Sequence, residues 1–171
     1  ALNQHAAVLH YQHYRHQPPQ RPHSFLLDAG ACYHGYAADI TRTYGGCGVE
    51  QSDSAFAALI DDLERAHQAL INGIGVEDSF IDLHRQMCLE IGRLLEQHGL
   101  VNASPEAQLH EGILTAFFPH GLGHLLGLQV HDVGRLQADA QGTCAPPPEA
   151  HPFLRLTRRL QPRMVFTIEP G

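Results

Sequence analysis

Two aspartates, Asp28 and Asp39, flank a segment whose only other titratable charge at neutral pH would come from His34. A hairpin that turns on His34-Gly35 would pair Asp28 with Thr41 and make the two aspartates diagonal neighbours, with backbones roughly 7 Å apart. When two carboxylates lie at such a short distance, either the pKa of one of them is raised or cations bind between them. Two divalent ions about 3.5 to 4 Å apart are one solution. The alternative is a pair of solvated surface acids, which the apolar flanks of the segment oppose.

Three histidines, His120, His124 and His131, form a second group of potential ligands. Histidines bind metals, but they also satisfy hydrogen bonds in protein cores. The glycines in His120-Gly-Leu-Gly-His124 let the backbone approach a ligand or a strand, and the segment lacks the glutamate of the helical His-Glu-x-x-His zinc motif. Glu169 follows the apolar run Val165–Ile168, where a buried carboxylate is costly unless it is paired. On its own it could also cap a turn.

The elements that must position these residues follow from the hydrophobic pattern. Strands are predicted at Ala6–Tyr11, Ser24–Asp28, Ala38–Tyr44 and Met164–Ile168, with Tyr33 opposite Tyr36 in the hairpin. Helices are predicted at Ser52–Ile71, with Ser52 or Asp53 as N-cap, at about Asp78–Gly99, and from Ser104 toward Leu114. Phe117–His131 is predicted to form strand and turn structure because glycines interrupt it. Strands at both ends with helices between them indicate an α+β fold.

The composition limits the possible classes of function. The chain has 171 residues, of which 43% are apolar, and this suits one domain with a buried core. Its net charge of -7 includes no basic stripe, so no nucleic acid partner is expected. No apolar run reaches about 18 residues and no leader pattern is visible, so no membrane association is expected. The four cysteines (Cys32, Cys47, Cys88 and Cys144) are scattered, which favours a reducing cytoplasm over a disulfide framework or a thiolate zinc site.

Four segments occur in a fixed order along the chain. They are Asp28 to Asp39 with the continuation Ile-Thr-Arg-Thr, Pro119-His-Gly-Leu-Gly-His124, Gly127-Leu-Gln-Val-His-Asp-Val-Gly134, and Met164-Val-Phe-Thr-Ile-Glu-Pro-Gly171. In order and approximate spacing they resemble the metallopeptidases of the pita-bread fold, the family that includes methionine aminopeptidase, aminopeptidase P and prolidase. The first eleven residues, Arg21–Gly30 and the insertion Arg135–Pro162 are most similar to bacterial members that cleave Xaa-Pro dipeptides.

The resemblance implies a curved antiparallel sheet flanked by helices and a two-metal site with the ligands Asp28, Asp39, His124 and Glu169. Asp39 would bridge the ions, and Asp28 would be bidentate on one of them. A second bridging glutamate is expected beyond Gly171, in a Gly-x-Arg-x-Glu segment. Residues 1–171 are therefore expected to be a partial catalytic domain, without the N-terminal domain and the last strands of the family, and inactive alone.

Carboxylate and imidazole ligands suit hard to borderline ions, so two divalent ions per subunit are expected, most readily Mn²⁺, with Co²⁺ as a substitute. A hydroxide bridging them would attack the scissile carbonyl, which one ion polarises. The resemblance implies that Glu169 shuttles the proton, that His120 and His131 act on the tetrahedral intermediate, and that His10 and His131 bind the substrate.

The implied substrate is a dipeptide with a C-terminal proline, whose ring removes the amide hydrogen and fixes the chain, so that a dedicated site is needed. The resemblance also implies side activity on organophosphate esters and a homodimer. Three alternatives are an aminopeptidase P that takes longer Xaa-Pro peptides, a metal-free binding or scaffold module on the same fold, and a metal-free creatinase-like enzyme. Asp28 and Asp39 oppose the last of these.

Overall fold

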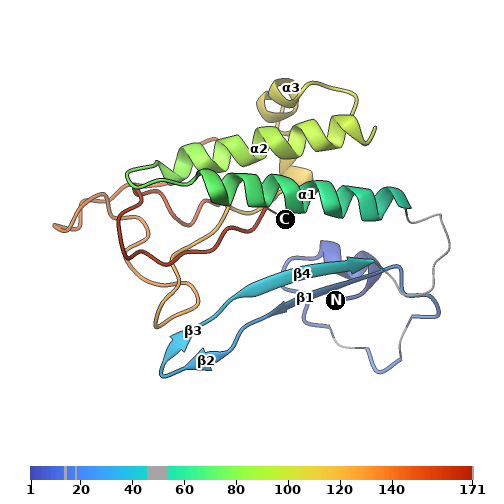
Figure 1. The fold of residues 1–171 in the computed structure, drawn as a ribbon, viewed down its shortest axis with the longest axis horizontal. Coiled ribbons are helices and arrows are strands. Elements are labelled where there is room, and N and C mark those ends of the chain that lie inside the picture. Colours follow the sequence, from blue (N-terminus) through green and yellow to red (C-terminus); the bar gives the residue numbers. More distant parts are fainter. Residues whose placement is uncertain (14, 18, 46–53, 171) are drawn as a thin grey trace.

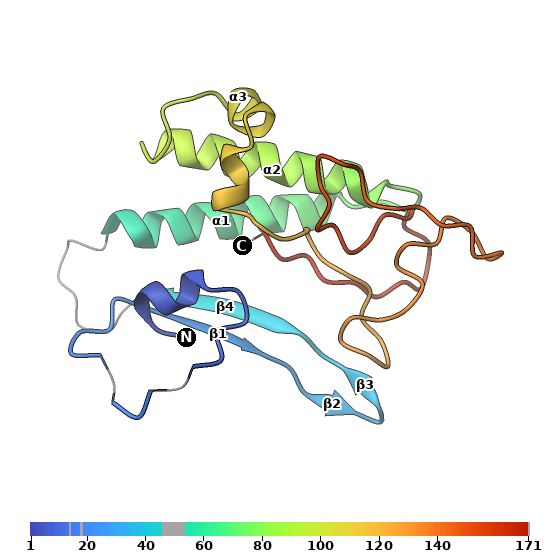
Figure 2. The same ribbon diagram turned by 180° about the vertical axis from the view of Figure 1, so that it is seen from behind.

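The computed structural model describes residues 1–13, 15–17, 19–45 and 54–170 (Figure 1). A long hairpin lies on one side of a layer of helices, and the C-terminal third runs as extended segments and turns beside both (Figures 1 and 2). The combination confirms the predicted α+β class. Cys47, the predicted N-cap positions Ser52 and Asp53, and Gly171 lie outside the described residues.

The hairpin has the predicted register. Strands β1 (Ser24–Ala29) and β4 (Ile40–Gly45) pair antiparallel with Asp28 opposite Thr41. Strands β2 (Cys32–Tyr33) and β3 (Tyr36–Ala37) continue the same register to the tip, with Tyr33 opposite Tyr36. The turn residues His34 and Gly35 have φ values of 50° and 86°, as a two-residue turn with two left-handed residues requires. No bulge therefore separates the two aspartates.

The long helices α1 (Ser54–Gly73) and α2 (Phe80–Gln97) confirm the two periodic runs. Ser79 caps α2, because its hydroxyl accepts a hydrogen bond from the backbone N–H of Asp82 at 3.3 Å. The third predicted helix is shorter than expected: α3 (Pro105–His110) is separated from the 3-10 helix η3 (Ile113–Ala116) by Gly112, at φ 73°. Within the described part of the chain, no helix is long and apolar enough to cross a membrane.

The core lies between α2 and the C-terminal segments that carry the histidines and Glu169. Phe80 and Met87 of α2 are fully buried together with Leu122 and Leu156. Burial of each such side chain contributes about 1.5 to 3 kcal/mol relative to exposure. The segments around residues 122 and 156 are therefore held against a rigid helix.

The predicted strand at Ala6–Tyr11 is wrong. Asn3–Ala7 form the 3-10 helix η1, and no strand follows it among residues 8–13. The Asn3 side-chain oxygen accepts a hydrogen bond from the backbone N–H of His23 at 2.7 Å, so a contact twenty residues away in sequence holds this segment. His10 has φ 55°, and a left-handed residue ends any extended run.

The predicted final strand at Met164–Ile168 is extended but does not form a regular ladder. Together with Glu169 it pairs antiparallel with residues 122–126 through three backbone hydrogen bonds and one isolated bridge, between Leu125 and Phe166. The predicted strand and turn structure of Phe117–His131 is therefore present as this pairing and as turns.

Candidate metal centre

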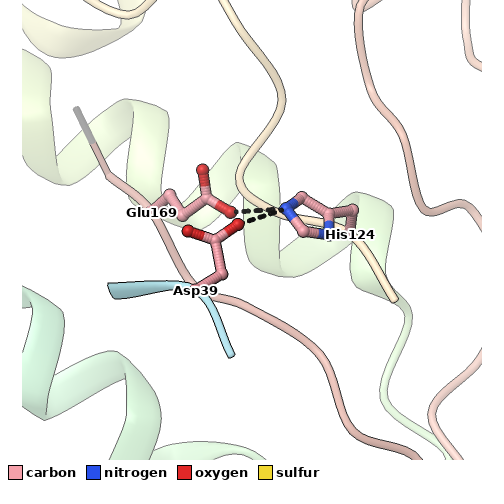
Figure 3. Close-up of side chains that lie close together, drawn as sticks. All are labelled: Asp39, His124 and Glu169. Carbon is pink, nitrogen blue, oxygen red and sulfur yellow. Dashed lines mark ion pairs between the residues drawn. The ribbon is translucent and has the colours of Figure 1, made fainter. Parts of the chain in front are cut away.

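Three side chains from distant parts of the chain meet at one point (Figure 3). Asp39 lies between β3 and β4, His124 in the glycine-containing segment, and Glu169 after the C-terminal extended run. The Nε2 atom of His124 is 3.3 Å from Oδ2 of Asp39 and 3.0 Å from Oε1 of Glu169. One ligand atom from each residue lies within 4.8 Å of the other two. This separation is small enough for all three to reach a single ion.

The backbone pairing that aligns His124 with Glu169 depends on a glycine. The N–H of Glu169 donates to the carbonyl of Leu122 at 2.7 Å, and the N–H of Thr167 donates to the carbonyl of His124 at 2.9 Å. The N–H of His124 donates instead to the hydroxyl of Thr167, at 3.0 Å, which interrupts the ladder. A Cβ atom at Gly123 would collide with the carbonyl oxygen of Thr167. The glycine thus permits the close approach that brings the two ligands together.

Substitution of Gly123 by alanine is expected to destabilise the fold by about 2 to 3 kcal/mol, because the clash is with backbone and cannot be relieved by a side-chain rotation. Gly73→Ala is the matched control, since no atom lies within 4 Å of a Cβ built there. Denaturant unfolding of both variants checks this prediction. Equal stability of the Gly123 and Gly73 variants would show that the approach at Gly123 is not restrictive.

The His124 ring is oriented to present an electron pair to the two carboxylates. Its Nδ1 lies 2.9 Å from the carbonyl oxygen of Leu125, which can only accept, so Nδ1 carries the proton. The neutral ring then has an acceptor at Nε2, facing two carboxylate oxygens. Among the described residues no hydrogen bond is assigned to the buried Oε1 of Glu169, although Nε2 of His124 lies 3.0 Å from it. Three acceptors facing one another require a cation or a proton between them, and this donor set fits a divalent metal ion.

The pKa values reflect the same conflict. Burial raises the pKa of Asp39, and the charges of Glu169 and Asp28 raise it further. Burial alone would lower the pKa of His124, but Glu169, the Leu125 carbonyl and Asp39 favour the charged ring, and its pKa is raised. Burial would raise the pKa of Glu169, yet His124 and Thr167 hold it below its usual value. A bound cation would relieve the repulsion between the carboxylates.

Asp28 is the predicted ligand that lies outside this group of three. It is exposed on β1, and its negative charge contributes to the raised pKa of Asp39. The hairpin therefore brings the two aspartates near each other, as the register predicts, while the ligand atoms that converge belong to Asp39, His124 and Glu169.

The other predicted histidines surround the centre. The ring of His131 packs edge-on against His124, with centroids 4.4 Å apart. Burial lowers the pKa of His131, and the charges of Arg155, His124 and His10 act in the same direction. The charge of His120 acts on the carboxylate of Glu169. His120 and His131 therefore interact electrostatically with groups of the centre, and His10 acts on His131.

Arg155 is a residue that the sequence reasoning missed. Its Nη1 lies 2.7 Å from Nδ1 of His131. The same Nη1 also lies 3.2 Å from Nε2 of His131, so the guanidinium contacts both ring nitrogens. Leu154 and Leu156, on either side of Arg155, are buried at 3% and 0% exposure. Arg158 and Arg159 follow in the same segment, so no sequence pattern distinguishes Arg155 from them.

This fold and this group of carboxylates and imidazoles are those of a metallopeptidase: the chain belongs to metallopeptidase family M24, whose family model matches residues 1–171. It is 54% identical over 172 aligned positions to proteins named Xaa-Pro dipeptidase from Yersinia pseudotuberculosis serotype O:1b and from Yersinia pestis strain Pestoides F. Each alignment covers 100% of this chain and 38% of the relative, so the chain spans well under half of their length.

Solved structures of Escherichia coli aminopeptidase P share the fold. The zinc-substituted enzyme in complex with product and the enzyme with the inhibitor Pro-Leu each have a TM-score of 0.73 and 27% identity, covering 95% of this chain and 33% of theirs. The predicted pita-bread fold is thereby confirmed for the part of the domain present in this chain.

Proposed function

We propose that residues 1–171 are part of the catalytic domain of a metal-dependent dipeptidase that hydrolyses Xaa-Pro dipeptides, with two divalent ions bound by Asp28, Asp39, His124 and Glu169. The observation that supports it most directly is the convergence of three electron-pair donors from Asp39, His124 and Glu169 (Figure 3). Manganese suits this donor set best, with cobalt as a substitute. Bound ions would lower the pKa of a water molecule toward neutrality and polarise the scissile carbonyl.

The side chains around the centre have complementary tasks in this proposal. Glu169 has a pKa below its usual value, so it is ionised and can accept the proton of the attacking water and pass it to the leaving nitrogen. His131, whose pKa is lowered, is neutral and can donate a hydrogen bond from its ring N–H to the developing oxyanion. His120 supports the charge of Glu169, and His10 lines the substrate side near His131.

The preference for a dipeptide is assigned to Arg155. A dipeptide presents the free carboxylate of its C-terminal proline next to the scissile bond, and a guanidinium can bind it with two hydrogen bonds. Arg155 is half-buried, beside His131, which itself packs on His124. A longer peptide has an amide in place of this carboxylate and would leave the cation unpaired.

Replacing Arg155 by glutamine is expected to raise KM for Gly-Pro about tenfold to a hundredfold, the effect of losing a hydrogen bond to a charged group. The kcat value should change little, because the metal ligands are untouched. Arg159→Gln is the matched control, since that exposed arginine donates to the backbone carbonyl of Glu77, away from the centre. Steady-state kinetics of the complete protein checks this. An unchanged KM in the Arg155 variant would contradict the assignment.

Aminopeptidase P is the second candidate, favoured by the similarity to the Escherichia coli structures. The two activities differ in substrate length. The complete protein is expected to hydrolyse Gly-Pro faster than Gly-Pro-Gly, and cleavage of the tripeptide alone would replace the dipeptidase proposal by aminopeptidase P. We also propose a side activity on organophosphate esters. A hydroxide held by two metal ions discriminates weakly between an acyl carbon and a phosphoryl phosphorus.

The proposal also extends to the rest of the protein. A second bridging glutamate is proposed to lie C-terminal to residue 171, and a separate domain N-terminal to residue 1. A homodimer and a cytoplasmic location complete it. The sequence that follows Gly171 in the complete protein is the direct check: a Gly-x-Arg-x-Glu segment would supply the fifth ligand.

A further inference from the structure

A buried pair of histidines connects helix α2 to the segment that carries Arg155. His84, in the second turn of α2, is 4% exposed, and its Nε2 lies 3.2 Å from Nδ1 of His151. The Sγ atom of Cys88 is 3.6 Å from the same Nε2. Neither histidine belongs to the metal centre, and neither has a task in the proposed reaction. A buried, hydrogen-bonded imidazole pair in a small core needs an explanation of its own.

The pair is uncharged at neutral pH. Burial lowers the pKa of His84 to about 4, and the neighbouring His151 and His120 act in the same direction. Burial and Arg85 also lower the pKa of His151. One neutral ring must therefore donate and the other accept. The Nδ1 of His84 is buried without a partner, and a bare acceptor there costs less than an orphaned N–H. The Nε2–H of His84 thus donates to Nδ1 of His151.

The hydrogen bond fixes the start of a short segment that ends at the cation of the site. The backbone N–H of Leu154 donates to the carbonyl of His151 at 3.1 Å. Leu154 and Leu156 insert into the core, and Arg155 between them is directed to the other side, toward His131. The segment is therefore held at His151 by α2 and at the two leucines by packing.

The imidazole of His84 is also linked by packing to His120, a second residue near the metal centre. The ring of Phe118 lies between His84 and His120, with centroid distances of 5.4 Å to His84 and 5.1 Å to His120. His84 is therefore linked to Arg155 through His151 and to His120 through Phe118, although it is far from the metal ligands in sequence.

We propose that His84 is a positioning residue for substrate carboxylate recognition: its hydrogen bond to His151 holds Arg155 against His131. This inference rests on the proposed preference for dipeptides. It differs from a purely structural role because it predicts an effect confined to substrates that have the free carboxylate.

The test compares Gly-Pro with Gly-Pro amide, which lacks the carboxylate, in the complete protein. His84→Phe keeps an aromatic ring of similar size and removes the hydrogen bond. We expect it to raise KM for Gly-Pro about tenfold, and to leave kcat and the KM for the amide near the wild-type values. His84→Gln, which retains a donor, should recover part of the loss. Cys88→Ala removes the thiol beside Nε2 of His84 but leaves both imidazoles and the hydrogen bond between them, so it should keep the wild-type ratio of the two substrates.

His151→Phe removes the same hydrogen bond from the half-buried side and provides the test if His84→Phe does not fold. Equal losses on Gly-Pro and the amide, or an unchanged ratio in both phenylalanine variants, would overturn the inference. A wild-type protein that does not distinguish the two substrates would instead refute carboxylate recognition itself. The two failures are therefore distinguishable.

Discussion

His124→Ala is expected to reduce kcat/KM for Gly-Pro by about a thousandfold or more, equivalent to roughly 4 kcal/mol of lost transition-state stabilisation. The residue is 3% exposed and contributes the nitrogen that faces both Asp39 and Glu169. Without it, two carboxylates remain opposite each other with no imidazole between them, and the site loses a ligand.

The control for this variant is His110→Ala, which removes an exposed histidine at the end of α3. Steady-state hydrolysis of Gly-Pro is measured for both variants in the presence of Mn²⁺, with circular dichroism to check that each is folded. A folded His124 variant with activity within tenfold of the wild type would show that this nitrogen is not required.

Acidification is expected to destabilise the folded protein through His84. The pKa of this residue is about 4 in the folded state and 6.5 in a model peptide, so the unfolded chain binds more protons between these values. The contribution of neutral His84 to the free energy of unfolding is fully present above pH 6.5 and is lost as the pH falls toward 4. The difference amounts to about 3 kcal/mol.

Denaturant unfolding of the wild type and of His84→Phe at pH 7 and pH 4 tests this. The groups close to His84 are His151, His120 and Cys88, and they remain in the variant. Between pH 7 and pH 4 the free energy of unfolding should therefore fall by about 3 kcal/mol more in the wild type than in the variant. An equal loss in both proteins would mean that His84 is protonated in the folded state at an ordinary pH.

The hairpin and the two long helices were predictable because their signals are local. His34 and Gly35 can both adopt the left-handed conformation, and this turn fixes the register of every residue pair in the hairpin, including Asp28 with Thr41. The failed strand at Ala6–Tyr11 was an apolar run whose fate depended on the Asn3 side chain and on contacts made twenty residues away. Local hydrophobicity does not contain that information.

The candidate site divides in the same way. Asp39, His124 and Glu169 belong to segments with recognisable spacing, so the resemblance could identify them. Arg155 and the pair of His84 with His151 carry no pattern, since 67 positions separate the two histidines and only the packing of α2 brings them together. Predicting them would have required the tertiary arrangement of the long insertion.

If Asp39, His124 and Glu169 bind a catalytic divalent metal, as we propose, the complete protein should retain it after equilibration with Mn²⁺ and removal of free ions, and analysis of its metal content tests this directly. We expect about two ions per chain in the wild type, a substoichiometric amount in Asp39→Asn, and activity that returns when Mn²⁺ is added to metal-depleted wild type. A wild-type protein that holds no divalent ion and gains no activity with manganese would contradict it and would favour a metal-free binding or scaffold module on the same fold.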